Sequence, residues 1–278
     1  MYLEILGSGQ DAGVPQIGCL CSNCLLAHKD PNYRKLASSI AVIDDNHDVI
    51  FIIDASPDIK YQYYSIYKKK KNNDKISEKN FPPIFLTHTH YGHLAGLWLL
   101  GKECLDANSV KVYCSPKVKK FLETSHPFIH LISRKNILPT ELAINETLQI
   151  SNCTIESFEV PHRNEYADTV GYQITNNKRI VYLPDLDSWN KELIERISRA
   201  DIALIDGTFY SNNEIPSYSH VPHPPIIETM QLFSNLKTKI IFTHFNHTNP
   251  ILNDESIEKS QLINNGFKIA HDNMQIMI

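Results

Sequence analysis

Residues 84–93 read IFLTHTHYGH, an apolar run that leads directly into histidines at positions 88, 90 and 93. The apolar run predicts a short buried strand, and residues 93–102 predict a helix. His88, His90 and His93 would then lie on a strand-to-helix turn, which reverses the chain and can aim three imidazoles at one point. Convergence of this kind is the geometry of a metal site. An unstructured histidine tract can also bind metal, but this one lies mid-chain between apolar segments.

The composition is that of an ordinary globular protein, apart from 13 histidines and 6 cysteines in 278 residues. The 27 basic and 31 acidic side chains give a formal net charge of -4, which argues against a protein that holds nucleic acid by charge. The sequence has no internal repeat and no linker rich in Gly, Ser or Pro. We therefore expect a single domain over residues 1–278.

The first residues resemble those of a cytosolic protein. Residues 1–10, MYLEILGSGQ, place Glu4 among the first apolar residues and lack the basic and apolar regions of a signal peptide. No segment approaches the roughly 18 apolar residues of a membrane helix. We expect a cytoplasmic protein without a membrane partner, in which thiols stay reduced and clustered cysteines bind metal.

Short β-branched runs bounded by turn formers predict strands, and apolar segments of helical length between them predict helices. The expected strands are residues 2–6, 39–43, 49–53, 83–87, 110–113, 154–160, 170–174, 179–183, 201–205 and 238–243, with two short strands at the carboxyl end. The expected helices are residues 58–70, 93–102, 116–123, 190–198, 225–234 and 255–264. This order predicts an α/β or α+β fold with helices packed outside stacked sheets.

A polar side chain follows the end of four further predicted strands, at His162, Asp185, Asp206 and His244. Strand ends are where the sheets of α/β proteins gather ligands and catalytic groups. One such residue alone is more often a turn former or a helix cap. Its repetition at four strand ends favours a functional edge.

At these residues the sequence resembles the metallo-β-lactamase superfamily of metallohydrolases. That superfamily has a HxHxDH motif and then a lone His, a lone Asp and a final His, each at a strand end. The matching residues here are His88, His90, His93, His162, Asp185 and His244. The resemblance covers nearly the whole chain and implies an α/β fold of the four-layer αβ/βα sandwich type, with a metal centre along one edge.

The resemblance also implies a role for each of these residues. His88, His90 and His162 would hold a first metal, His93 and His244 a second, and Asp185 would bridge the two. Asp54, in the stretch IIDAS, would orient the site from behind the ligands.

One position departs from the motif, because Gly92 stands where the superfamily has the Asp that binds the second metal. The second site would keep His93, His244 and a share of Asp185, so we expect it to bind weakly, to stay empty or to recruit water. The first site retains a full set of ligands. Three histidines and a carboxylate can hold iron or manganese as readily as zinc.

A separate site for a structural Zn²⁺ is indicated by Cys19, Cys21 and Cys24, which lie within six residues on a Gly- and Pro-containing stretch. Three thiolates are one ligand short of a closed tetrahedral zinc site. His247 is the best candidate for the fourth, because His244 could face the catalytic centre while His247 faces the cysteines. Buried reduced cysteines are the alternative, but the stretch has no apolar periodicity to explain burial. A zinc ion there would contribute to folding.

Three stretches are similar to the PQQ-biosynthesis protein B (PqqB) family: residues 6–24 (LGSGQDAGVPQIGCLCSNC), 38–42 (SSIAV) and 55–59 (ASPDI). The chain also resembles the cyclic phosphodiesterases of phosphonate breakdown, which keep the full HxHxDH motif. It lies between the two groups, because typical PqqB members have a degraded histidine motif and this chain lacks only the Asp.

His220 and His223, in SHVPHPP, precede a predicted helix. Near this position the phosphodiesterase relatives carry a histidine that can protonate a leaving group. The resemblance therefore favours His223 as a general acid, with His220 as the second candidate. A surface histidine without a catalytic role is the alternative.

Two functions fit these residues. The first is a metallohydrolase for a small-molecule phosphodiester or ester, in which a metal lowers the pKa of bound water from about 15.7 to about 7 and the resulting hydroxide attacks. The alternative is an iron-dependent oxygenase-type step in PQQ cofactor biosynthesis, as the PqqB resemblance implies. A binding module without activity would leave His162, Asp185 and His244 unexplained. The sequence allows a homodimer in either case.

Overall fold

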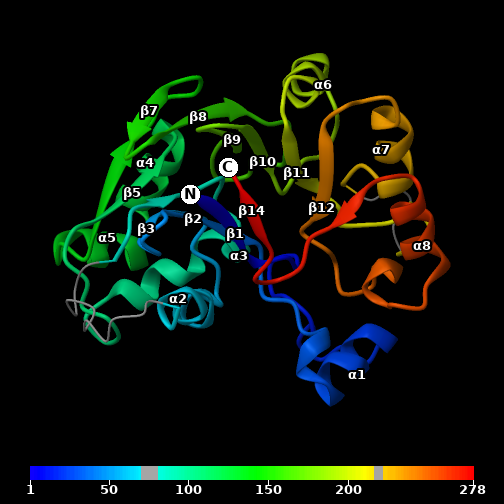
Figure 1. Cartoon of the computed structure of the whole chain (residues 1–278). Coiled ribbons are helices and arrows are strands. Elements are labelled where there is room, and N and C mark those ends of the chain that lie inside the picture. Colours follow the sequence, from blue (N-terminus) through cyan, green and yellow to red (C-terminus); the bar gives the residue numbers. More distant parts are fainter. Residues whose placement is uncertain (70–80, 216–221) are drawn as a thin grey trace.

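Two mixed β-sheets face each other in the computed structural model, and helices cover their outer faces (Figure 1). The structure describes residues 1–69, 81–215 and 222–278. In these residues each sheet has seven strands. In each sheet some neighbouring strands pair antiparallel and the others pair parallel. The fold class expected from the sequence, α/β with helices outside stacked sheets, is confirmed.

The first sheet has the strand order β14-β1-β2-β3-β4-β5-β6. Pairing is antiparallel from β14 to β3 and parallel from β3 to β6. The strands are β1 (Tyr2–Gly7), β2 (Ser39–Ile43), β3 (Val49–Ile53), β4 (Ile84–Phe85), β5 (Val110–Cys114), β6 (Ile137–Glu141) and β14 (Gln275–Met277).

The second sheet has the order β13-β12-β11-β10-β9-β8-β7 and is parallel from β13 to β10. Its strands are β7 (Thr147–Ile150), β8 (Cys153–Glu159), β9 (Val170–Thr175), β10 (Arg179–Leu183), β11 (Ile202–Asp206), β12 (Lys239–Thr243) and β13 (Lys268–Ile269). Strand β11 reads IALID and is buried throughout, as expected for a parallel strand covered on both faces.

The helices pack apolar residues against the outer faces of the sheets, except α1 (Ser22–Lys29), which projects from the body of the molecule (Figure 1). The other helices are α2 (Ile59–Tyr67), α3 (Tyr91–Leu94), α4 (Pro116–Thr124), α5 (His126–Ser133), α6 (Lys191–Ser198), α7 (Ile226–Phe233) and α8 (Ile257–Asn264), with 3-10 turns at Pro31–Tyr33, Ala95–Leu100 and Pro250–Leu252. In α6, for example, Leu193 and Ile197 are buried, and the Asn190 side chain caps the helix by accepting a hydrogen bond from the Leu193 amide. No helix in the described ranges is long and apolar enough to cross a membrane.

Several elements differ from the sequence expectation. The helix expected at residues 93–102 is a short α3 followed by a 3-10 turn. The sequence did not predict α1, α5, β6 or β7. Strand β6 contains Pro139, which argues against a strand, but β6 lies at the edge of its sheet, where a missing amide hydrogen is tolerated.

Between the sheets lies one apolar core, built from β1–β3 on one side and β8–β12 on the other. A buried hydrogen bond crosses it, because the Tyr172 hydroxyl in β9 donates to the Leu86 carbonyl at 2.7 Å. Leu86 directly follows β4 and precedes the histidine-rich turn. The bond therefore ties the second sheet to the segment that carries His88.

We predict that Tyr172→Phe lowers the free energy of unfolding by about 1–3 kcal/mol, because it removes a buried hydrogen bond and leaves a carbonyl without its donor. Tyr182 is a matched control. It lies opposite Tyr172 in β10, is equally buried, and its hydroxyl has no partner among the described residues. Tyr182→Phe should leave stability within about 0.5 kcal/mol or raise it. Urea unfolding curves measure both, and equal effects would contradict the role of the Tyr172 bond.

Candidate metal centre

Strand ends of both sheets meet at one place and bring the predicted metal-binding residues together. His88 and His90 follow β4, and His93 lies in α3. From the second sheet come the side chains that follow β8, β10 and β12, which are His162, Asp185 and His244. All these residues except His90 are buried. The structure thus brings these six predicted residues together at one edge, in contact with one another.

A first cluster contains His88, His90, His162 and Asp185, whose ligand atoms all lie within 4.8 Å of one another. The Asp185 Oδ2 atom lies 3.5 Å from His88 Nε2 and 3.2 Å from His162 Nε2. His162 Nε2 lies 3.3 Å from His90 Nδ1. Ligands at about 2.0–2.1 Å around a tetrahedral ion are themselves about 3.4 Å apart. These spacings therefore fit a divalent cation.

A second cluster contains His93, His244 and Asp11, again with ligand atoms within 4.8 Å. The Nε2 atoms of His93 and His244 lie 4.0 and 3.8 Å from Asp185 Oδ2, so this one oxygen faces both clusters. The sequence left this site with His93, His244 and a share of Asp185. The structure adds Asp11, which comes from the loop after β1.

Each histidine of the two clusters has a partner for the ring nitrogen that faces away from the centre. These pairs are His88 Nδ1 with Thr87 Oγ1, His90 Nε2 with Glu165, His93 Nδ1 with Asp54, His162 Nδ1 with Asp187, and His244 Nδ1 with Thr208 Oγ1, at 2.8–3.3 Å. Outer partners of this kind set the tautomer and orientation of metal-binding histidines. The inward Nε2 atoms of His88, His93 and His244 have no hydrogen-bond partner among the described residues.

Asp54 lies where the sequence expected a residue that orients the site. Its carboxylate accepts hydrogen bonds from the Thr87 amide at 2.8 Å, from the Thr87 hydroxyl at 3.0 Å and from His93 Nδ1 at 2.8 Å. The backbone of Asp54 has a φ of 67°, a left-handed conformation that a non-glycine residue adopts at a cost. Asp54 thus joins the end of β3 to both histidine-bearing segments.

The charges within the centre oppose the effect of burial. Burial would raise the pKa of Asp185, but the surrounding imidazoles, His244 and His223 above all, hold it well below its usual range. Burial would also lower the pKa of His93, yet the neighbouring Asp54 carboxylate raises it to about 9. His88 has no such close carboxylate on its outer side, and burial lowers its pKa. The centre is therefore built around a carboxylate anion.

His223 lies beside the first cluster and is buried. Its Nδ1 lies 2.7 Å from Asp206 Oδ2 and 3.3 Å from Asp185 Oδ1. Burial lowers its pKa, but these two carboxylates outweigh burial and raise it to about 9. Asp206, at the end of β11, is thus a partner of His223 rather than a member of either cluster. His220, the second candidate for the acid, lies outside the described residues.

A pocket of about 250 Å³ opens next to His223. Its lining includes Arg163, whose Nη2 lies 3.2 Å from His223 Nε2, together with the apolar side chain of Phe209. The pocket can therefore offer both a cation and a histidine to a small anionic molecule.

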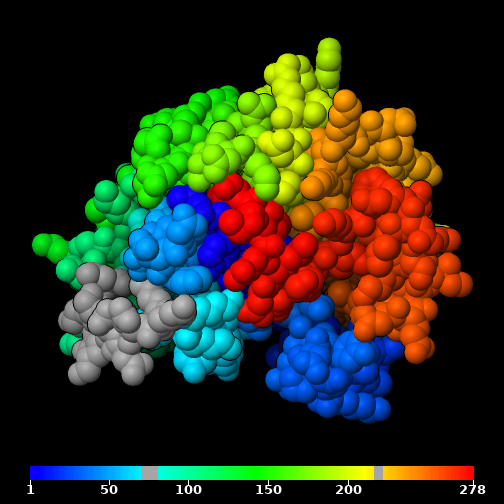
Figure 2. Space-filling model, viewed as in Figure 1, coloured from blue at the N-terminus to red at the C-terminus, as the bar shows by residue number. Residues whose placement is uncertain are grey.

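The structure brings the three cysteines of the amino-terminal segment together with His247. His247 Nδ1 lies 3.4 Å from Cys19 Sγ and 3.5 Å from Cys21 Sγ, and with Cys24 the four ligand atoms lie within 4.8 Å of one another. Figures 1 and 2 show that the α1 segment projects from the body of the molecule. The cluster joins this projection to the segment after β12, as do the hydrogen bonds of the Asn23 side chain to the His247 and Asn249 carbonyls.

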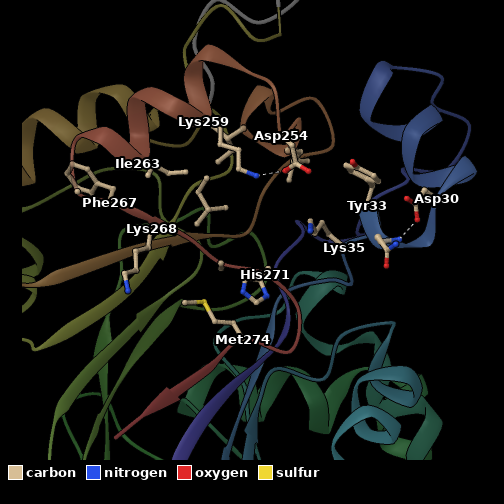
Figure 3. A pocket seen from close by; sticks show the side chains of 16 residues that line it. Asp30, Tyr33, Lys35, Asp254, Lys259, Ile263, Phe267, Lys268, His271 and Met274 are labelled. Atoms are coloured by element: carbon tan, nitrogen blue, oxygen red, sulfur yellow. Dashed lines mark hydrogen bonds and ion pairs between the residues drawn. The ribbon is translucent and has the colours of Figure 1, made fainter.

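Another pocket, of about 720 Å³, lies between α8 and the segment that follows α1 (Figure 3). In it Lys259 points to Asp254 and forms an ion pair at 2.5 Å. Asp185, Asp206 and His223 form a fourth group of potential metal ligands in the described residues, beside the two clusters and the cysteine cluster, and none of the four includes a residue of this pocket.

Comparisons with known proteins find a matching family model and relatives that match along the whole chain. The Beta-lactamase superfamily domain model matches residues 50–245, more than half of the chain. Coenzyme PQQ synthesis protein B of Pseudomonas protegens is 25% identical over 99% of both chains, and that of Nitrosococcus oceani is 28% identical over 100% of both. Zn²⁺-bound PqqB from Methylobacterium extorquens superposes with a TM-score of 0.87, at 25% identity and with 100% of both chains covered. A diphosphatase of the PhnP family, 24% identical over 100% of this chain and 97% of its own, shares the fold with a TM-score of 0.74.

The pair of Asp54 and His93 predicts a pH-dependent stability in the chelator-treated protein. Because the pKa of His93 is raised to about 9, the pair stabilises the fold fully below pH of about 6.5 and loses its contribution as pH rises through 9. Asp54→Asn should cost about 3 kcal/mol at pH 6 and much less at pH 10. Denaturant unfolding at both pH values measures this difference.

The control is the same substitution in a His93→Gln background, where the dependence on pH should disappear. A cost of Asp54→Asn that stays constant from pH 6 to pH 10 would show that the charge on His93 does not stabilise the fold.

Proposed function

The chain belongs to the Beta-lactamase superfamily domain family, and from this membership and its two ligand clusters we propose that it is a metal-dependent hydrolase of a small phosphodiester or ester. One observation carries the proposal. Asp185 Oδ2 faces both clusters, with four imidazole Nε2 atoms at 3.2–4.0 Å. A carboxylate between two groups of histidines suits a bridging ligand of two divalent ions.

The residues of the centre fit divalent metal. Buried polar atoms normally have hydrogen-bond partners. The inward Nε2 atoms of His88, His93 and His244 have none among the described residues, so their lone pairs are available to a metal ion. Neutral imidazole and carboxylate are ligands for zinc, manganese and iron alike. We propose His88, His90, His162 and Asp185 as ligands of the first ion, and His93 and His244 as ligands of the second. Ions held there would polarise a phosphoryl or carbonyl oxygen and acidify a water molecule.

The remaining steps belong to the protein itself. The Arg163 guanidinium can bind an anionic oxygen of a substrate in the adjoining pocket. His223 is held by Asp206 through Nδ1, and its Nε2, which pairs with Arg163 in this structure, would give a proton to the leaving oxygen once a substrate anion takes over the guanidinium. Asp206 therefore positions the acid, while Arg163 positions the substrate.

We predict that His88→Ala and Asp185→Ala each lower kcat for bis(p-nitrophenyl) phosphate by at least about 1000-fold, because each removes several kcal/mol of stabilisation at the reacting centre. His130→Ala, which changes an exposed histidine in α5, serves as the control and should keep full activity. Release of p-nitrophenol by the metal-loaded protein measures the rate. Inactivity of the wild-type protein on phosphodiesters, lactones and thioesters with zinc, manganese and iron would refute the hydrolase.

A second function is favoured by the relatives, which are named as PQQ synthesis proteins and match along the whole chain. This candidate is an iron-dependent oxygenase-type step in PQQ biosynthesis. Three histidines with one carboxylate can hold iron, and the two functions use the same first site. Oxygen uptake by the iron-loaded protein with a tyrosine-containing peptide, without hydrolysis of the phosphodiester, would favour this candidate over the first.

For the cysteine cluster we propose a structural Zn²⁺ held by Cys19, Cys21, Cys24 and His247. The spacing of 3.4–3.5 Å between the His247 nitrogen and two sulfur atoms supports a tetrahedral site with Zn–S bonds of about 2.3 Å. Burial raises the pKa of the Cys24 thiol to about 12, and a bound cation would offset that cost of ionisation. Such a site closes a link between the amino-terminal segment and the chain after β12.

We predict that Cys21→Ser removes one zinc equivalent and lowers Tm by roughly 5–10 °C, because the link contributes a few kcal/mol to folding. Cys104→Ser is the matched control, since Cys104 is exposed and lies in none of the four groups of potential ligands in the described residues. Elemental analysis and thermal unfolding give the two values. Full zinc content and an unchanged Tm in Cys21→Ser would argue for simple reduced cysteines.

A further inference from the structure

We propose that Asp11 supplies the carboxylate ligand that Gly92 lacks, and so completes the second metal site with His93, His244 and Asp185. The inference rests on the proposed metal-dependent function and names a residue for it from outside the histidine motif. It changes the expectation for the second site from a weak or empty position to one with a full set of ligands.

The contact between Asp11 and Gly92 is the first support. A Cβ atom built on Gly92 would lie 2.3 Å from Asp11 Oδ1 and 2.4 Å from Asp11 Cα. Distances this short are not possible, so Asp11 occupies the space that a side chain at position 92 would need. An acidic side chain can therefore reach the second site from position 92 or from position 11, but not from both.

The second support is the arrangement around the site. A carboxylate oxygen of Asp11 and the inward nitrogens of His93 and His244 lie within 4.8 Å of one another. Both nitrogens are buried and have no hydrogen-bond partner among the described residues. Asp185 Oδ2 lies 4.0 Å from one and 3.8 Å from the other. Two imidazoles and two carboxylates surround one point, which is a suitable donor set for zinc, manganese or iron.

The loop that carries Asp11 is held in place by the segment that carries His244. The Phe245 amide donates to the Ser8 carbonyl at 2.9 Å, and the Gln10 amide donates to the Phe245 carbonyl at 2.9 Å. The Gly13 amide then closes a turn onto the Gln10 carbonyl at 2.6 Å. Asp11 lies in this turn with a φ of 30°, outside the favoured regions for a non-glycine residue. These hydrogen bonds hold the backbone around Asp11 beside the segment that carries His244.

The test measures metal content and affinity, and activity is not needed. The wild-type chain, loaded with Zn²⁺ and dialysed, should hold about three equivalents: one at the cysteines and two at the centre. Asp11→Ala and the isosteric Asp11→Asn should each lose about one equivalent, and the remaining affinity of that site in chelator competition should fall at least about 100-fold. Glu255→Ala, an exposed change far along the chain, should keep all three.

A ligand exchange separates the role of Asp11 in metal binding from a structural one. The double variant Asp11→Gly with Gly92→Asp moves the carboxylate from one side of the contact to the other, and should recover the lost equivalent. Gly92→Asp alone should unfold at a lower temperature than wild type, because the new side chain overlaps Asp11.

Three results would overturn the proposal. They are a wild-type protein with only about two equivalents, an Asp11→Ala variant with wild-type zinc content and affinity, and a double variant that folds but does not recover the third ion. Failure of the proposed function can be distinguished from failure of this proposal. A protein that has no hydrolase activity, holds its full zinc and loses one ion in Asp11→Ala would still support Asp11 as a metal ligand.

Discussion

The buried carboxylate of Asp185 is the group around which the two halves of the molecule meet. Only 3% of its side chain is exposed, and burial by itself disfavours the anion. Imidazoles from both sheets surround it, with Nε2 atoms of His162 and His88 at 3.2 and 3.5 Å. Since these side chains follow strands of different sheets, the position of one carboxylate depends on how the two sheets face each other.

The histidines of the centre are held in place by hydrogen bonds on the sides of their rings that face away from the centre. Asp54 joins Thr87 to His93, Thr208 holds His244, and Asp187 holds His162. Each of these partners fixes a ring so that its other nitrogen faces inward. A centre preorganised in this way loses little conformational freedom when it binds an ion, which is the physical advantage of outer partners.

Two segments far apart in the chain contribute both to the cysteine cluster and to the second metal site of the centre. Residues 8–24 carry Asp11 and the three cysteines, and residues 244–247 carry His244 and His247. Backbone hydrogen bonds between Ser8, Gln10 and Phe245 run between these sites. Hydrogen-bonded backbone therefore connects the cysteine cluster to the centre. A metal at the cysteines would also help to place Asp11 and His244.

The sequence by itself determined the strands that lead to His162, Asp185, Asp206 and His244, and the histidine-rich turn after β4, because an apolar run that leads into a polar side chain is a local pattern. It determined the cysteine cluster for the same reason, since three thiols within six residues share one environment. Only the tertiary structure decided that Asp11 fills the space above Gly92, that Asp206 belongs to His223, and that a strand with Pro139 lies at a sheet edge. These facts depend on which distant backbone segments approach one another, and the spacing of residues along a chain carries no record of that approach.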